Sequence, residues 1–62
     1  MEKLFIHYKD GGQLTVTAKG KTANLMEKWE REYARRSSRF KLAWIQKYPK
    51  KDYPPIILAD NS

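Results

Sequence analysis

Cysteine is absent from the 62-residue chain, and histidine occurs once, as His7. The chain therefore has no disulfide, no thiolate metal site, no cysteine nucleophile and no histidine-rich metal site. Long apolar runs are also absent, since the longest two, at 42–45 and 56–59, have four residues each. A membrane span needs about 20 apolar residues, and a secretory signal needs an apolar stretch of about 7–15. We therefore expect a cytoplasmic protein without a membrane segment.

Catalytic patterns are missing as well. His7 has no second histidine or cysteine nearby for a metal and no evident partner for acid–base catalysis. Gly11 and Gly12 are not followed by the Lys-Ser/Thr pair of a phosphate-binding loop. A fold of this size also leaves little room for a substrate pocket. We expect no catalytic, cofactor-binding or metal-binding residue, and a binding module rather than an enzyme.

Two alternating segments open the chain. Residues 3–9 and 13–19 alternate apolar with polar or outward-facing side chains, which is typical of half-buried strands. The Asp-Gly-Gly sequence at 10–12 lies between them, and glycine permits the positive φ of a tight turn. The first third of the chain is therefore predicted to be a β-hairpin.

A helical period follows. Apolar residues between 25 and 33 fall on one face of a helix, which is predicted to run from about residue 23 to 37 with Thr22 as its N-cap. Two favourable i,i+4 pairs are expected, Glu27 with Arg31 and Glu32 with Arg36. Alternation returns at 39–48, which predicts a third strand that ends at Pro49. Residues 56–59 are either a short fourth strand or a segment packed along an edge, and residues 60–62 are expected to fray.

The predicted fold is therefore a single α+β domain over residues 1–59, with β-β-α-β order. A small sheet in the order 2-1-3 carries one helix on one face. The predicted core is formed by the large apolar residues that alternation assigns to the helix side: Leu4, Ile6, Tyr8, Leu14, Val16, Leu25, Met26, Trp29, Tyr33, Phe40, Leu42 and Trp44. The opposite, uncovered face is predicted to carry Phe5, His7, Thr15, Thr17, Ala43 and Ile45.

The net charge of +6 is concentrated in one part of the chain. Residues 35–51 hold seven basic residues and no carboxylate, which is an electrostatic signature of polyanion binding. Two tyrosines near the end of this stretch are candidates for base stacking. The candidate contact residues are Arg35, Arg36, Arg39, Lys41, Lys47, Tyr48, Lys50, Lys51 and Tyr53.

Two functions remain open on this reading. The first is a nucleic-acid-binding module that relies on phosphate contacts and has low sequence specificity. The second is a protein-binding module, such as a small phage-like inhibitor or adaptor, whose uncovered sheet face binds an acidic protein. A homodimer formed through the uncovered face is a further alternative.

Overall fold

A computed structural model describes residues 2–17 and 22–61, which form four strands, one α-helix and two short 3₁₀-helices. The elements are, in order, β1 (Glu2–Tyr8), β2 (Gln13–Thr17), α1 (Thr22–Glu32), η1 (Ala34–Arg39), β3 (Phe40–Lys47), η2 (Lys50–Asp52) and β4 (Ile56–Asp60). The strands form one antiparallel sheet in the order β2-β1-β3-β4. This confirms the predicted order and makes residues 56–60 a true fourth strand. Residues 18–20, predicted to end the second strand, lie outside the described residues.

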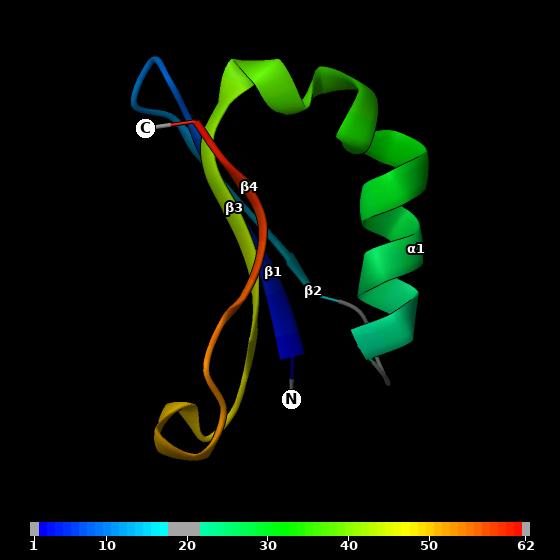
Figure 1. The fold of residues 1–62 in the computed structure, drawn as a ribbon, viewed down its shortest axis with the longest axis vertical. Helices are drawn as coiled ribbons and strands as arrows, with labels where there is room; N and C mark the ends of the chain where they lie inside the picture. Colours follow the sequence, from blue (N-terminus) through cyan, green and yellow to red (C-terminus); the bar gives the residue numbers. More distant parts are fainter. Residues whose placement is uncertain (1, 18–21, 62) are drawn as a thin grey trace.

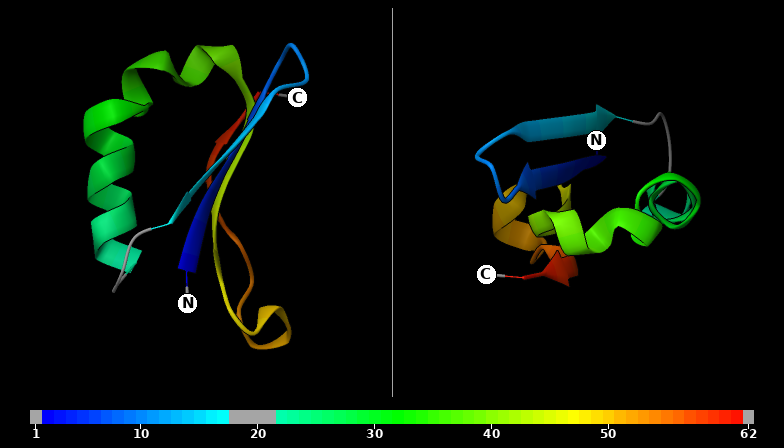
Figure 2. Two further views of the ribbon diagram at one scale, coloured as in Figure 1. Left: turned by 180° about the vertical axis from the view of Figure 1, so that it is seen from behind. Right: turned by 90° about the horizontal axis from the view of Figure 1, so that it is seen from above.

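The protein has two layers (Figure 1). Helix α1 packs against one face of the sheet, and η1 leads from its end to the start of β3. Within the described residues, no helix or strand lies over the opposite face (Figure 2). The segment that joins β3 to β4 extends toward that opposite side, at the end of the sheet away from the β1–β2 hairpin. The molecule is accordingly thin, with a shortest extent of 15 Å.

The β1–β2 turn confirms the role expected of its glycines. Gly11 has a φ of 97°, in the region that only glycine enters at little cost. The backbone N–H of Gly12 donates to the Asp10 carboxylate at 2.8 Å, and that of Tyr8 donates to the Gly12 carbonyl at 2.8 Å. These bonds fix the loop length and therefore the register of the two strands.

Helix α1 ends earlier than predicted, at Glu32 rather than near residue 37. Leu25 and Trp29 are buried against the sheet, but residues 35–39 offer no apolar side chain to hold a further turn there. The chain continues instead as η1, with a kink at Arg36. The hydroxyl of Thr22 is buried without a hydrogen-bond partner among the described residues, so the predicted side-chain cap is not seen.

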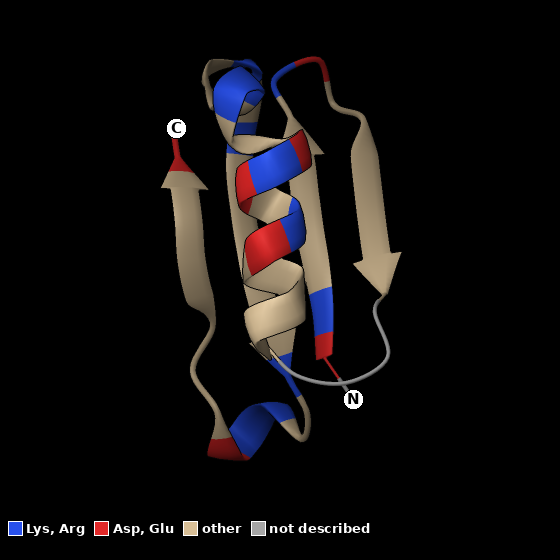
Figure 3. Ribbon diagram, turned by 90° about the vertical axis from the view of Figure 1, so that its right-hand side faces the viewer, with Lys and Arg blue, Asp and Glu red and all other residues tan. Residues whose placement is uncertain are grey.

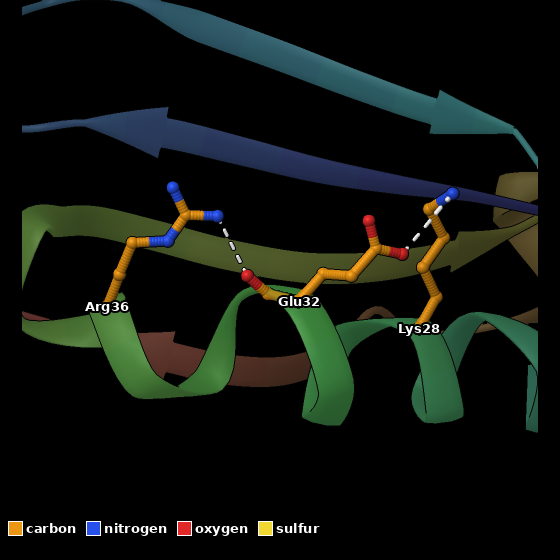
Figure 4. A network of polar contacts seen from close by, with 3 residues as sticks. All are labelled: Lys28, Glu32 and Arg36. Atoms are coloured by element: carbon orange, nitrogen blue, oxygen red, sulfur yellow. Dashed lines mark hydrogen bonds and ion pairs between the residues drawn. The ribbon is translucent and has the colours of Figure 1, made fainter.

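One of the two predicted helix pairs is confirmed and the other is replaced. Arg31 lies 3.1 Å from the Glu27 carboxylate, as expected. The Glu32 carboxylate instead pairs with Lys28 at 3.5 Å, and Arg36 donates to the backbone carbonyl of Glu32 at 2.8 Å (Figure 4). Because α1 ends at Glu32, its carbonyl lacks a helical partner, and the guanidinium satisfies it.

The core lies between α1 and the two central strands, β1 and β3. Aromatic contacts tie the helix to the sheet at one end, where Phe40 packs against Trp29 at 5.6 Å and Tyr8 at 5.3 Å between ring centroids. The buried apolar side chains of the described residues are Leu4, Ile6, Leu25, Trp29, Phe40, Ala43 and Ile45.

The predicted orientation of β3 is wrong beyond Phe40. The β1–β3 ladder pairs Tyr8 with Phe40 but His7 with Leu42, so one extra residue of β3 forms a bulge there. Because side chains alternate along a strand, the extra residue exchanges the two faces for the rest of β3. The four residues whose predicted faces are exchanged are Leu42, Ala43, Trp44 and Ile45.

Ala43 and Ile45 are therefore fully buried in the core rather than on the uncovered face. Leu42 and Trp44 lie on the side away from α1 instead of in the core, because they pair with His7 and Phe5.

Residues 60 and 61 are more ordered than the predicted fraying, and residue 62 lies outside the described residues. Asp60 is the last residue of β4. The backbone N–H of Asn61 donates to the Lys41 carbonyl at 2.9 Å, and its side chain donates to the carbonyls of Ser37 at 2.8 Å and Phe40 at 3.0 Å. Asn61 thus holds the end of β4 against the junction between η1 and β3.

Candidate binding surface

The open face is the side of the sheet away from α1, and the strand register defines its members. Residues that pair directly across neighbouring strands point to the same side. Phe5, which pairs with Thr15 and Trp44, marks the centre of this face. The open face comprises Lys3, Phe5, His7, Gln13, Thr15, Thr17, Leu42, Trp44, Gln46, Ile57 and Asp60.

An aromatic cluster of Phe5, His7 and Trp44 occupies the middle of the open face, on the two central strands. The Phe5 and Trp44 rings stack with centroids 5.1 Å apart and an interplanar angle of 22°. The His7 ring meets the indole edge-on, with centroids 4.9 Å apart and an angle of 68°. All three side chains are half-buried. Phe5 and His7 were predicted on this face, whereas Trp44 was assigned to the core, so the sequence analysis missed the cluster.

The two sides of the cluster differ in polarity. On β2 the open face presents Thr15 and Thr17, both exposed. On β4 it presents Ile57, which is 53% exposed and pairs with Trp44. Asp60 supplies the one carboxylate among the described open-face positions, at the β4 edge. The cluster thus lies between a hydrogen-bonding side and an apolar side.

Gln46 was not singled out by the sequence, yet it organises one end of the open face. It is only 4% exposed, and its side-chain amide donates to the carbonyls of Lys47 at 2.9 Å and Tyr53 at 3.1 Å. A buried amide with two such bonds holds the β3–β4 connection in place. A lone glutamine within an alternating strand carries no sequence signal for this role.

The two candidate stacking tyrosines lie in that connection. Tyr48 is 37% exposed and has the Lys3 ammonium 5.9 Å from its ring centroid. Tyr53 is 43% exposed and has the Lys47 ammonium at 5.3 Å. Both rings therefore already contact a lysine, and they lie at one end of the sheet rather than beside the aromatic cluster.

The seven basic residues of 35–51 do not form one patch. Arg35, Arg36 and Arg39 lie on η1 at one end of the sheet; we call them the η1 basic group. Lys47, Lys50 and Lys51 lie at the other end; we call them the η2 basic group. Lys41, the second residue of β3, belongs to neither group. β3 separates them, and a strand of its length spans roughly 23 Å. Figure 3 shows Lys and Arg at both ends, with the strands between them largely free of charge.

Two of the seven cations are already engaged. Arg36 donates to the Glu32 carbonyl and lies 5.9 Å from the Tyr33 ring centroid. Lys47 lies 3.7 Å from the Glu2 carboxylate. The other five are exposed, with no side-chain partner within the described part of the chain: Arg35, Arg39, Lys41, Lys50 and Lys51. They are the residues of the predicted set best placed to meet a ligand.

The outer surface of α1 differs from both basic groups. Glu27, Glu30 and Glu32 are exposed there, and Arg31 and Lys28 pair with two of these carboxylates. Acidic and basic residues alternate along the helix in Figure 3. This surface has no excess of positive charge, so α1 is not suited to face a polyanion.

A group of metal ligands, a membrane-spanning helix or a pocket would indicate a different kind of site. Over 2–17 and 22–61, no three His, Cys, Asp or Glu side chains are grouped as metal ligands would be. None of the helices in these ranges is long and apolar enough to cross a membrane. A shallow hollow lies between the β1–β2 turn and η1, and Lys9, Asp10 and Arg39 are among the residues that line it.

Comparison of the chain with known protein families, curated proteins and solved structures finds no match. The function is therefore argued from the arrangement of the residues alone.

Proposed function

We propose that the protein is a cytoplasmic nucleic-acid-binding module whose two basic groups, at opposite ends of the sheet, contact phosphates. The observation that carries this proposal is the placement of the charge. Exposed cations lie at both ends of the sheet, and its open face has aromatic rings at its centre and a single carboxylate, Asp60, among its described positions. Phosphate contacts supply most of the affinity of low-specificity nucleic-acid binders.

The separation of the two groups favours a long polyanion over a small one. At physiological salt the Debye length is about 8 Å, so groups roughly 23 Å apart act on different phosphates. A mononucleotide reaches one group, whereas an oligonucleotide reaches both, and the second contact then forms at high effective concentration. The affinity should therefore rise steeply once an oligonucleotide is long enough to bridge β3.

A salt titration tests the proposal. We expect fluorescence anisotropy to detect binding of a labelled oligonucleotide at low salt, with log Kobs falling linearly against log salt. Three to five neutralised phosphates predict a slope of about −2 to −3.5 for a single strand. A length series should show weak binding of mononucleotides under the same conditions. The absence of binding at 50 mM salt, or binding that is indifferent to salt, would refute the proposal.

A protein-binding module is the second candidate, favoured by one observation at the sheet edge. Among the described strands β4 is paired on one side only, with β3, and its Ile56 and Ile57 are 38% and 53% exposed. An exposed apolar edge strand can pair with a strand of another protein, and the basic groups would favour an acidic partner. In this case Ile57→Asp should abolish binding of the protein partner. The salt titration with oligonucleotides should then show no salt-dependent binding.

A further inference from the structure

We infer that the bound nucleic acid is single-stranded and that an unpaired base stacks on Trp44 in the aromatic cluster. This inference rests on the proposed function and specifies its ligand. Three observations carry it: the geometry of the cluster, the width of the sheet, and the position of the cluster on the face toward which the η2 segment extends.

The geometry of the cluster makes Trp44 a rigid platform. Phe5 stacks nearly parallel to the indole at 5.1 Å, and His7 supports it edge-on at 4.9 Å. The indole is half-buried, so it is neither a core side chain nor a freely moving one. Stacking of an unpaired base on an aromatic side chain stabilises single-strand complexes without requiring a particular base. Because the indole is already held in place, binding of a base costs little additional side-chain entropy at Trp44.

A duplex cannot take this four-stranded face into its major groove. Four strands about 4.8 Å apart place the outer two roughly 14 Å from each other, which exceeds the ~12 Å width of the major groove of B-DNA. The open face therefore cannot enter the groove as a helix or a two-stranded ribbon does. The alternative element, α1, carries three exposed glutamates, two of them paired with Lys28 and Arg31, so its outer surface has no positive excess that would attract phosphates. A single strand, whose bases are free to turn toward the sheet, meets neither obstacle.

The position of the cluster matches the path of such a strand. Trp44 lies in the middle of β3, between η1 at one end and η2 at the other. The segment that carries η2 extends toward the open face, whereas η1 lies on the α1 side of the sheet (Figure 1). A chain that contacts Lys50 or Lys51 and follows the open face of β3 toward Arg39, which directly precedes the strand, therefore passes over the cluster. Its bases would have the exposed hydroxyls of Thr15 and Thr17 beside them on β2. Phosphates then lie at the ends and bases at the centre.

The test uses Trp44 as its own reporter. A Trp29→Phe protein retains Trp44 as its sole tryptophan, because the chain has two. Single strands and duplexes of equal length are titrated against this protein at low salt, with tryptophan emission and the anisotropy of a labelled oligonucleotide read together. We expect single strands to bind at least tenfold more tightly and to quench the emission.

Variants at the cluster complete the test. Trp44→Leu, made in the unaltered chain, should weaken single-strand binding about 5- to 150-fold, the range expected from the loss of one stacked base. It should leave duplex binding and the slope of the salt dependence unchanged. Trp44→Phe keeps an aromatic plane and should recover most of the affinity. Denaturation midpoints of the variants report whether each remains folded.

Three outcomes separate the inference from the proposed function. Tighter binding of single strands with quenched emission and a selective loss in Trp44→Leu supports the inference. Equal binding of duplexes, with unchanged emission and no effect of Trp44→Leu, overturns the inference and leaves a phosphate-binding module. Absence of binding to either nucleic acid at low salt overturns the proposed function itself.

Discussion

Replacement of Ile45 by aspartate is expected to leave the protein largely unfolded at 25 °C. Ile45 is fully buried between the sheet and α1. The substitution removes about 2 kcal/mol of apolar burial, and an unpaired buried charge costs several kcal/mol more. A domain of 62 residues has a total stability of roughly 3–9 kcal/mol. Far-ultraviolet circular dichroism and urea denaturation measure the effect.

The adjacent residue supplies the matched control. Trp44→Asp introduces the same charge one position away, but on the open face, where the indole is only half-buried. The loss of its stacking with Phe5 should cost about 0.5–1.5 kcal/mol, together with part of its apolar burial, so this variant should stay folded. The opposite result, a folded Ile45→Asp and an unfolded Trp44→Asp, would contradict the bulged register of β3.

This pair of residues also shows where sequence reasoning stops. The alternation in 3–9 and 13–17, with Gly11 between them, correctly predicts β1, β2 and their turn, because only one face of each segment is consistently apolar. Residues 42–45 are apolar without interruption, so alternation permits either face. Regular alternation from Phe40, with the lysines at 41 and 47 on the other side, assigned Trp44 to the core. A single-residue bulge across from His7 turns Trp44 to the open face and Ile45 to the core. Bulges depend on tertiary packing, which the sequence of one strand does not reveal.

Reversing the charge of both basic groups should have the largest effect on ligand binding. We expect Arg35→Glu, Arg39→Glu, Lys50→Glu and Lys51→Glu, combined in one protein, to weaken oligonucleotide binding roughly 100- to 1,000-fold at low salt. Each exposed contact is worth about 0.7–1 kcal/mol, and 1.4 kcal/mol corresponds to a tenfold change. None of the four side chains has a partner among the described residues, so the fold should tolerate the changes. Fluorescence anisotropy gives the affinity.

A charge-matched comparison separates a local contact from the effect of net charge. The double variant Lys50→Glu and Lys51→Glu should lose roughly 10- to 30-fold in affinity. Lys28→Glu with Arg31→Glu alters the net charge equally, but on α1, and should lose less than about threefold. It gives up two helix-surface pairs of about 0.3–0.5 kcal/mol each. Equal losses in the two double variants would show that binding depends on net charge alone.

The candidate site was predictable in its residue types but not in its layout. The seven basic residues are visible in the sequence as a run without carboxylates. Their division into two groups follows from β3, which places Arg39 and Lys47 at opposite ends of a strand. Arg36 donates to the Glu32 carbonyl because α1 ends early, at Glu32. Lys47 forms an ion pair with Glu2 because the two residues are paired across the β1–β3 ladder. Such contacts depend on which strands become neighbours in space.

The two tryptophans allow the most direct test of the open face as the binding surface. Trp29 lies in the core at 6% exposure, and Trp44 lies in the aromatic cluster on the opposite side of the sheet. Nuclear magnetic resonance resolves their two indole N–H signals during titration with a single-stranded oligonucleotide. We predict a large shift of the Trp44 signal at a stoichiometric ratio and a small shift of the Trp29 signal. An unmoved Trp44 signal at saturation would contradict the proposed surface.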